Sequence, residues 1–450
     1  MKCLERRLLI TMKRHIDKAL AEWKLNQSRK VLLLRGARQV GKTWSVRNLG
    51  KGFSYFLEIN FESAREIHQF FTHDLDPEEI CRNLSAYYNV PITDGDTLLF
   101  FDEIQACIPA ISSLRFFYEK RPGLHLIAAG SLLEFALEQL PSYGLGRIEH
   151  LFLFPMSFDE YLLAAGQREL LEMKAVSSPE KPLNPAIHNR LNTLLKEFLY
   201  VGGMPEAVKT YIQSKDLRKI SHVLDQFLNG LMGDFAKYKS RVALSRLREV
   251  FDAVVFQSGC KFNLHKASPS SNYFQIKEAI NLLEMAGLIH KVHHTSADGT
   301  PLGSQINLSK FKIIMFDHGI YQRIMGLDLS DYLLADSFSA INQGNIAEQF
   351  AGTEMIKYAN PGTRDNLFYW HRETRGSNAE VDYLFQIGTS IKPVEIKSGM
   401  QGKMQSLQVF LKEKRISSGI RVSMENFGQY GNFQIYPLYA IHELMSGNSN

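Results

Sequence analysis

The chain has 450 residues, more than one hydrophobic core usually holds, so about two to four domains are expected. Hydrophobic residues make up 45% of the sequence and charged residues 22%, a balance typical of a soluble globular protein. The net charge of +5, from 52 basic and 47 acidic residues, permits a polyanionic partner but does not require one.

The cysteines and the apolar runs limit the compartment. The four cysteines lie far apart without a C-x-x-C spacing, so neither a zinc site nor a disulfide framework is indicated. No stretch approaches the roughly 18 consecutive apolar residues of a membrane-spanning helix. The opening "MKCLERRLLITMKRHIDKAL" mixes charges through its apolar positions, whereas a signal peptide needs an uninterrupted apolar core. We therefore predict a cytoplasmic protein with no membrane partner.

The stretch "VLLLRGARQVGKTWSV" combines an apolar strand, a glycine-bounded loop and the start of a helix. Gly36, Gly41, Lys42 and Thr43 match the phosphate-binding pattern G-x-x-x-x-G-K-[ST]. The glycines let the backbone N–H groups face the phosphates, and the helix N-terminus adds favourable partial charge. We predict an ATP site in which Lys42 reaches the β and γ phosphates and Thr43 ligates Mg²⁺. A chance turn between a strand and a helix is the alternative.

A second apolar strand, "DTLLFFDEIQ", ends in two acids. We predict that Asp102 holds Mg²⁺ through water and that Glu103 polarises the water that attacks the γ-phosphate. A strand that ends in Asp-Glu is often only a solvated strand end. Its place after a phosphate loop favours the catalytic interpretation.

Two further positions are candidates for contact with the phosphates. The run "LHLIAAGS" ends in Ser131, where AAA-type ATPases place a polar sensor beside the γ-phosphate, although a small polar strand terminus is an ordinary feature. Arg147 follows a glycine-rich turn and could be the arginine finger that stabilises charge on the transferring phosphoryl group. If it acts in trans, the protein must form a homo-oligomer. A loop cap or a pair with a surface acid is the alternative.

A family resemblance emerges from these and later motifs. "GARQVGKT", "FFDEIQ", "LHLIAAGSLLEFAL", "GRIEHLFLFPMSFDEYL" and "YVGGMPEAV" occur in this order. The chain resembles the AAA-type ATPases of bacteria and archaea that carry a winged-helix segment and a C-terminal PD-(D/E)xK nuclease-like domain of uncharacterised function. The resemblance implies a core sheet with the phosphate-loop strand central and a Mg-ATP site at the carboxyl ends of the strands.

Helical spacing follows the core, and Gly202, Gly203 and Pro205 predict a tight bend in the helical lid region. The run "FQIKEAINLLEMAGLIHKVHH" then predicts an amphipathic helix, a stop at Gly287 and a strand, and "FKIIMFD" predicts a second strand. Helix, strand, turn and strand form the second half of a winged helix, a module that binds DNA in some proteins and other proteins elsewhere. Nearby lysines could meet phosphates or form a plain solvated face.

The last hundred residues carry a second set of acids. Glu348 lies in a predicted helix, Asp382 lies in the alternating strand "AEVDYLFQI", and Glu395 and Lys397 lie on one face of "SIKPVEIKSG". This order matches the PD-(D/E)xK layout, in which Asp382 and Glu395 bind Mg²⁺, Glu348 supports the metal shell and Lys397 positions the attacking water. Polar alternation on a half-exposed hairpin, with no chemistry, is the alternative.

We therefore predict an α/β protein with a P-loop AAA-type core, a helical region, a winged helix and an α/β restriction-endonuclease-like domain. The expected limits are 1–165, 166–235, 236–330 and 331–450. The predicted function is Mg-dependent ATP hydrolysis coupled to a nuclease-like domain directed at DNA. The alternative is an ATP-driven conformational switch whose nuclease-like domain is inactive and only binds a partner.

Overall fold

The computed structural model describes most of the chain in ten ranges. They are residues 12–72, 74–140, 144, 146–235, 241–268, 272–326, 344–362, 367–374, 378–397 and 404–446. The predicted domain limits at 235 and 330 adjoin or fall in segments outside these ranges.

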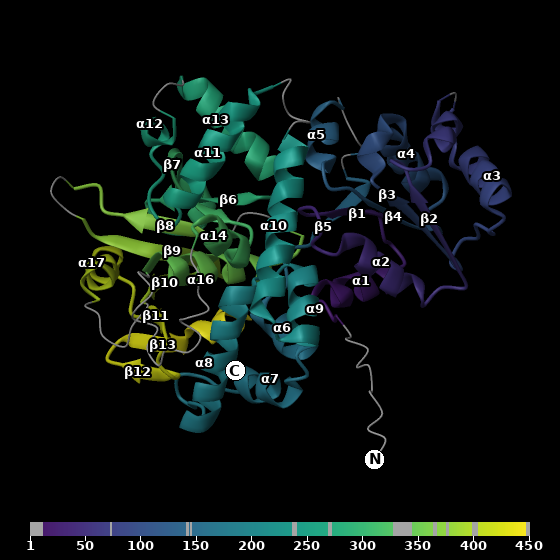
Figure 1. Ribbon diagram of the computed structural model, residues 1–450. Coiled ribbons are helices and arrows are strands. Elements are labelled where there is room, and N and C mark those ends of the chain that lie inside the picture. Colours follow the sequence, from purple (N-terminus) through teal and green to yellow (C-terminus); the bar gives the residue numbers. More distant parts are fainter. Residues whose placement is uncertain are drawn as a thin grey trace, which may run out of the picture.

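The first sheet has five parallel strands in the order β2-β3-β4-β1-β5. Its strands are β1 (Val31–Arg35), β2 (Tyr55–Asn60), β3 (Thr97–Asp102), β4 (His125–Ala129) and β5 (Ile148–Phe152). The α-helices around it are α1 (Ile16–Leu25), α2 (Lys42–Gly50), α3 (Pro77–Tyr88), α4 (Ile108–Lys120) and α5 (Leu133–Glu138), as Figure 1 shows. Two short 3-10 helices, η1 (Arg65–Phe71) and η2 (Ile104–Ala106), lie between them in the sequence. As the resemblance implies, the phosphate-loop strand β1 lies inside the sheet, between β4 and β5.

Both faces of this sheet are covered, which explains why β1 reads as an almost continuous apolar run. Leu32 and Leu34 point into a core that continues through the rest of the molecule. Leu33 points to the other face, where it packs into a separate core with residues of α3 and α4. The sheet is therefore a rigid platform, and its carboxyl edge can present polar loops.

Five helices follow the first sheet. They are α6 (Phe158–Ala164), α7 (Arg168–Ala175), α8 (Pro185–Val201), α9 (Pro205–Ser214) and α10 (Leu217–Asp234). The predicted bend is confirmed: Gly202 has φ of 78° between α8 and α9, and a Cβ there would lie 2.7 Å from Asp317 Oδ1. Figure 1 shows α10 standing between the two sheets of the molecule.

The next segment has the order predicted for the winged helix. Its elements are α11 (Leu244–Phe256), α12 (Leu264–Ala267), α13 (Tyr273–Met285), β6 (Ile289–Thr295), η4 (Leu302–Gln305) and β7 (Ile306–Met315). Gly287, with φ of 72°, follows α13 as predicted. The strands β6 and β7 are antiparallel and pair along most of their length.

The second sheet has eight strands in the order β12-β13-β11-β10-β9-β8-β6-β7. The remaining elements are α14 (His318–Ile324), α16 (Gly344–Tyr358), β8 (Phe368–His371), β9 (Glu380–Ile387), β10 (Ser390–Ile396), α17 (Gln405–Lys414), β11 (Gly419–Ser423), β12 (Gly428–Tyr430), β13 (Phe433–Pro437), η6 (Leu438–Ala440) and α18 (Ile441–Ser446). The sequence predicts β6 and β7 as part of a winged helix apart from the C-terminal strands, but His293 of β6 pairs in parallel with Phe368 of β8. An isolated hairpin is marginally stable, and β8 covers its free edge.

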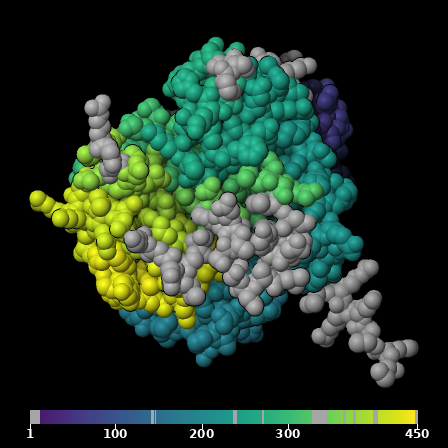
Figure 2. Space-filling model, turned by 60° about the vertical axis from the view of Figure 1, so that its left-hand side comes forward, coloured from purple at the N-terminus to yellow at the C-terminus, as the bar shows by residue number. Residues whose placement is uncertain are grey.

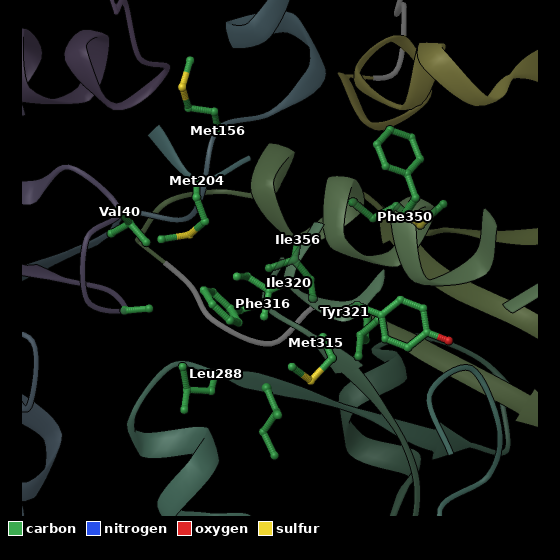
Figure 3. Close-up of a cluster of buried hydrophobic side chains, with 14 of the residues drawn as sticks. Val40, Met156, Met204, Leu288, Met315, Phe316, Ile320, Tyr321, Phe350 and Ile356 are labelled. Carbon is green, nitrogen blue, oxygen red and sulfur yellow. The ribbon is translucent and has the colours of Figure 1, made fainter. Parts of the chain in front are cut away.

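One hydrophobic core joins the two sheets. Figure 3 shows Val40 of the phosphate loop in the same cluster as Met204 before α9, Leu288 before β6 and Phe316 after β7. In the space-filling view the C-terminal residues (yellow) and the teal helices α11–α13 share one face, with green residues between them (Figure 2). The phosphate loop is therefore in packing contact with segments far away in the sequence.

Across the part of the chain that the structure describes, no helix is both long enough and apolar enough to cross a bilayer.

Candidate functional site

The phosphate loop lies between the carboxyl end of β1 and the first turn of α2. Gly36 and Gly41 both have positive φ, 145° and 101°. A Cβ at Gly36 would lie 2.1 Å from Leu153 O, and one at Gly41 would lie 3.2 Å from Arg14 Nη1. Arg14 also donates to Val40 O at 2.7 Å. The two glycines predicted to shape the loop are thus required by backbone conformation and by close approach.

Lys42 is buried at the start of α2 and has 6% of its surface exposed. Its ammonium group donates to Gly36 O and Ala37 O, both at 2.9 Å. Burial lowers its pKa to about 8, although Glu103 and Asp102 act in the opposite sense. An ammonium group folded onto the loop carbonyls is available to a phosphate that enters the loop.

The predicted magnesium ligands meet at one point. Thr43 Oγ1 donates to Asp102 Oδ2 at 3.1 Å, so the first turn of α2 touches the end of β3. Burial, and next the charge of Glu103, raise the pKa of Asp102. A hydroxyl and a carboxylate this close fit the oxygen ligands that Mg²⁺ takes beside a phosphate loop.

Glu103 is held in a fixed orientation by two neighbours. Its backbone is left-handed, with φ of 50°, a strained conformation for a residue with a side chain. Gln105 Nε2 donates to Glu103 Oε2 at 2.6 Å, and the backbone N and Oγ of Ser131 donate to the same oxygen at 3.3 and 3.2 Å. Ser131, predicted to lie beside the γ-phosphate, thus contacts Glu103, the residue predicted to polarise the attacking water, and Gln105 was not predicted. A Cβ at Gly130 would lie 1.9 Å from Gln105 Oε1.

Arg147 is placed away from the phosphate loop. It precedes β5, whose first residue Ile148 pairs in parallel with Val31, the first residue of β1. Arg147 therefore lies at the amino edge of the sheet, opposite to the carboxyl edge that carries the loop. Its Nε pairs with Glu119 Oε1 at 2.5 Å, as in the alternative interpretation from the sequence. A finger role within the same chain is excluded by this position, and only a role toward a second copy remains.

The phosphate loop is also contacted by the α13–β6 turn. A Cβ at Gly287 would lie 3.2 Å from Ala37 N. Arg38 pairs with Asp234 at the end of α10. A small cavity beside the loop is lined by Gly36, Ser131, Glu134, Met285, Gly287 and His290, among others. Two distant segments therefore touch the loop that a nucleotide would fill.

The C-terminal acids converge as the sequence predicted. Glu348 on α16, Asp382 on β9 and Glu395 on β10 lie in one cluster, and β9 and β10 are antiparallel neighbours. Lys397 Nζ donates to Glu395 Oε1 at 2.6 Å, and the N–H of Ile396 donates to Asp382 Oδ2 at 2.7 Å. Burial raises the pKa of Glu395 to about 7. Burial also raises the pKa of Glu348, and the charge of Lys312 opposes that shift.

The lysine at the centre of this cluster was not predicted from the sequence. Lys312 of β7 is 2% exposed, and its Nζ donates to Glu348 Oε1 at 2.8 Å. It also pairs with Glu380 Oε1 and lies 3.9 Å from Asp382 Oδ1. The signal in the sequence is a single charge within the apolar run "FKIIMF". The acids of this cluster are therefore partly neutralised by the chain itself.

The fit of this cluster to a metal ion is partial. Glu395 Oε2 is buried and has no hydrogen-bond partner in the described part of the chain, so one carboxylate oxygen remains for an ion. A different cluster in the described ranges brings three ligand atoms within 4.8 Å of one another. These atoms belong to Asp159, His442 and Glu443. Lys174 donates to Glu443 at 2.6 Å and lies 2.9 Å from Asp159, which fills that group with an ammonium ion.

Comparison with known proteins assigns families to three parts of the chain. Residues 28–162 match the AAA domain family. Residues 192–331 and 343–441 match two domains of unknown function, DUF8612 and DUF4143. The first sheet and its phosphate loop therefore lie in the segment that is similar to AAA domains. No curated protein matches the chain.

Two solved structures are similar to the chain. One is a Walker-type ATPase of Pyrococcus abyssi, with 15% sequence identity, a TM-score of 0.45, and coverage of 70% of this chain and 96% of that one. The other is a signal transduction ATPase with numerous domains and a tetratricopeptide-repeat sensor, from Pyrococcus horikoshii. It has 11% identity, a TM-score of 0.26, and coverage of 76% of this chain and 45% of that one. At these scores neither likeness bears on the function of the chain.

Proposed function

We propose that the chain hydrolyses Mg²⁺-ATP at the phosphate loop and couples this cycle to a nuclease-like C-terminal region directed at DNA. The observation that carries the proposal is the meeting of Thr43 and Asp102 at 3.1 Å beside the buried ammonium group of Lys42. Oxygen ligands for Mg²⁺ and a positive charge for the phosphates then lie together at the carboxyl edge of the sheet.

Each residue of the nucleotide site has a separate task. The loop N–H groups and Lys42 bind the phosphates, and Thr43 and Asp102 hold Mg²⁺, which neutralises charge on the phosphate oxygens. Gln105 and Ser131 fix Glu103 Oε2, which leaves Oε1 to accept the proton of the attacking water. Arg147 could contribute only from a second copy of the chain.

The coupling would pass through the segments that touch the loop. Ala37 lies against Gly287 at the α13–β6 turn, and Val40 shares a core cluster with Phe316 at the end of β7 (Figure 3). A nucleotide that draws Lys42 toward its phosphates changes the loop at these contacts. Because packed cores respond by discrete shifts, β6 and β7 are the segments that would relay the change to the second sheet.

Cleavage of DNA at the C-terminal acids is favoured by one observation in particular. Glu395 has a buried oxygen that finds no hydrogen-bond partner among the described residues, next to Lys397 and in the same cluster as Asp382. Asp382 and Glu395 would hold a divalent ion, and Lys397 would position the attacking water. Glu348 would support the metal shell. The lysine pairs of the same cluster favour the alternative, in which the region only binds a partner and the chain acts as an ATP-driven switch.

One assay tests both halves of the proposal. We expect Lys42→Ala to lower ATP turnover by at least about 100-fold, because it removes charge stabilisation at the phosphates, while Lys51→Ala at the exposed end of α2 leaves turnover unchanged. Plasmid and single-stranded DNA are then incubated with Mg²⁺ or Mn²⁺, with and without ATP. Cleavage that is lost in Asp382→Asn supports the nuclease half.

The two failures can be told apart. Turnover retained by Lys42→Ala would reject the phosphate loop assigned here. Intact DNA under every condition, with normal ATP turnover, would refute the nuclease half and leave the partner-binding switch.

A further inference from the structure

The ammonium group of Lys312 lies between carboxylates, in the kind of position that a metal ion takes. It comes from β7, whose neighbouring residues 311 and 313–315 are all buried and apolar. Its Nζ reaches Glu348 on α16 at 2.8 Å and Glu380 on β9, with Asp382 at 3.9 Å. Carboxylates from two different elements therefore converge on one buried positive charge.

The other half of the cluster is arranged differently. Glu395 is 6% exposed, and its Oε1 accepts from Lys397 at the outer side of the cluster. Its Oε2 is buried without a hydrogen-bond partner among the described residues. Asp382 stands between the two halves, with Oδ1 toward Lys312 and Oδ2 on the N–H of Ile396. One half is closed by a lysine, while the other keeps an open ligand oxygen.

We propose that the ammonium group of Lys312 takes the place of a divalent cation between Glu348 and Glu380, so that this site holds at most one divalent ion, between Asp382 and Glu395. The proposal deepens the proposed function, and it rests on the proposed nuclease reaction only for the use of that single ion. A fixed ammonium ion needs no metal from solution, so the inner acids stay compensated at any Mg²⁺ concentration.

The lysine and the acids of this cluster come from two different parts of the chain. Lys312 lies in the segment matched to one domain of unknown function, residues 192–331, whereas the acids lie in the segment matched to another, residues 343–441. The antiparallel bridge between Lys261 and Lys312 fixes β7 against the chain that follows α11. The acid cluster is therefore complete only when the hairpin of β6 and β7 is paired with β8 in the second sheet.

The test is the number of Mn²⁺ ions bound per chain, measured by equilibrium dialysis and electron paramagnetic resonance. We expect Lys312→Met, which keeps an unbranched apolar stem, to bind one more ion than the native full-length chain. Lys357→Met is the matched control, because Lys357 is also buried and pairs with Glu354 on α16. We expect it to bind the native number of ions. Equal numbers in the native chain and in folded Lys312→Met would overturn the proposal.

A second variant keeps the test decisive if Lys312→Met does not fold. Glu380 is 30% exposed at its side chain, so Glu380→Gln is a milder change. If Glu380 faces Lys312 and no metal ion, Glu380→Gln binds as many Mn²⁺ ions as the native chain. Loss of an ion in this variant, or two ions in the native cluster, would overturn the proposal.

These readouts separate the proposal from the nuclease reaction. A native chain with no ion, and Lys312→Met with one, would support the role of Lys312 and refute metal-dependent cleavage. One ion in the native chain, lost in Asp382→Asn, with DNA left intact would support the role of Lys312 and refute cleavage alone.

Discussion

Lys42 and Lys312 are two buried lysines with opposite surroundings. Lys42 bonds to backbone carbonyls, and burial lowers its pKa to about 8. Lys312 lies among carboxylates, and although burial acts to lower its pKa, the charges of Glu348, Asp382 and Glu380 outweigh burial and raise it well above the usual value. The ATP site therefore keeps its positive charge for a ligand, whereas the C-terminal cluster uses its positive charge to balance its own acids.

The largest expected effect follows from this difference. Removal of one partner from a buried ion pair leaves uncompensated charge, so Lys312→Met should lower the free energy of unfolding by about 3–5 kcal/mol. Lys42→Met removes a buried charge that forms no ion pair with a carboxylate in the described part of the chain, and should change the same quantity by no more than about 1 kcal/mol. Urea denaturation of the nucleotide-free chain at pH 7 measures both.

The comparison would fail if the two variants lost similar stability. In that case Lys42 would also serve as a structural ion, and its assignment to a phosphate would lose its physical basis. Lys357→Met again serves as a reference, since its charge is buried beside Glu354 but lies outside both sites.

The same contrast explains what could be predicted from the sequence. The sequence predicted a strand, a loop and a helix around Gly36, Gly41, Lys42 and Thr43, and the structure has this order, because local backbone chemistry decides the structure of so short a segment. The order of the acids on α16, β9 and β10 was also predicted. On the two strands, the alternation of side chains shows which residues lie on the same face.

Two other contacts between distant segments, those of Lys312 with Glu348 and of Ser131 with Glu103, were not predicted. Lys312 and Glu348 lie 36 positions apart, and Ser131 and Glu103 lie 28 positions apart, so neither spacing carries a helix or strand period. The pairing of β6 with β8 was missed for the same reason, since alternation shows which face is buried but not which strand is the neighbour.

A pH scan of stability sharpens the comparison, because it tests a buried group in the scaffold that both sites share. His318 at the start of α14 is fully buried, and its Nε2 lies 3.0 Å from Phe198 O. Burial lowers its pKa to about 4, while the charges of Asp317 and Lys357 oppose each other. The unfolded chain binds a proton near pH 6.5 and the folded chain does not, so stability is full above that pH and falls as the pH drops toward 4.

We expect His318 to account for a loss of about 2 kcal/mol in the free energy of unfolding between pH 7 and pH 5. His318→Gln keeps a donor near Phe198 O and should remove this part of the pH dependence in urea denaturation at the two pH values. His222→Gln on the exposed face of α10 is the control and should leave the pH dependence unchanged. An equal pH dependence in native chain and His318→Gln would show that the acid-sensitive groups lie elsewhere.

The smallest expected effect is on kcat for ATP, and it concerns the hydrogen bonds that hold Glu103. Glu103 is held by the neutral donors of Gln105 and Ser131, whereas the C-terminal acids are held by lysines. If Gln105 aims Glu103 at the attacking water, Gln105→Leu should lower kcat for ATP by about 10-fold, the worth of one hydrogen bond to a charged group. KM for ATP should stay within about twofold, because Gln105 contacts the acid and not the nucleotide.

Gly130→Ala offers an independent route to the same result. Its Cβ would lie 1.9 Å from Gln105 Oε1, so the glutamine must move and kcat should fall to a similar extent with KM preserved. Gln69→Leu, exposed on η1, is the control for a lost glutamine. A rise in kcat for Gln105→Leu would reverse the interpretation, because the bond would then restrain Glu103 until ATP enters. In that case the hydrogen bonds that Gln105 and Ser131 donate to Glu103 would resemble the lysine pairs of the C-terminal cluster. Both would hold the acids in a resting arrangement, and these bonds would have to break before the reaction.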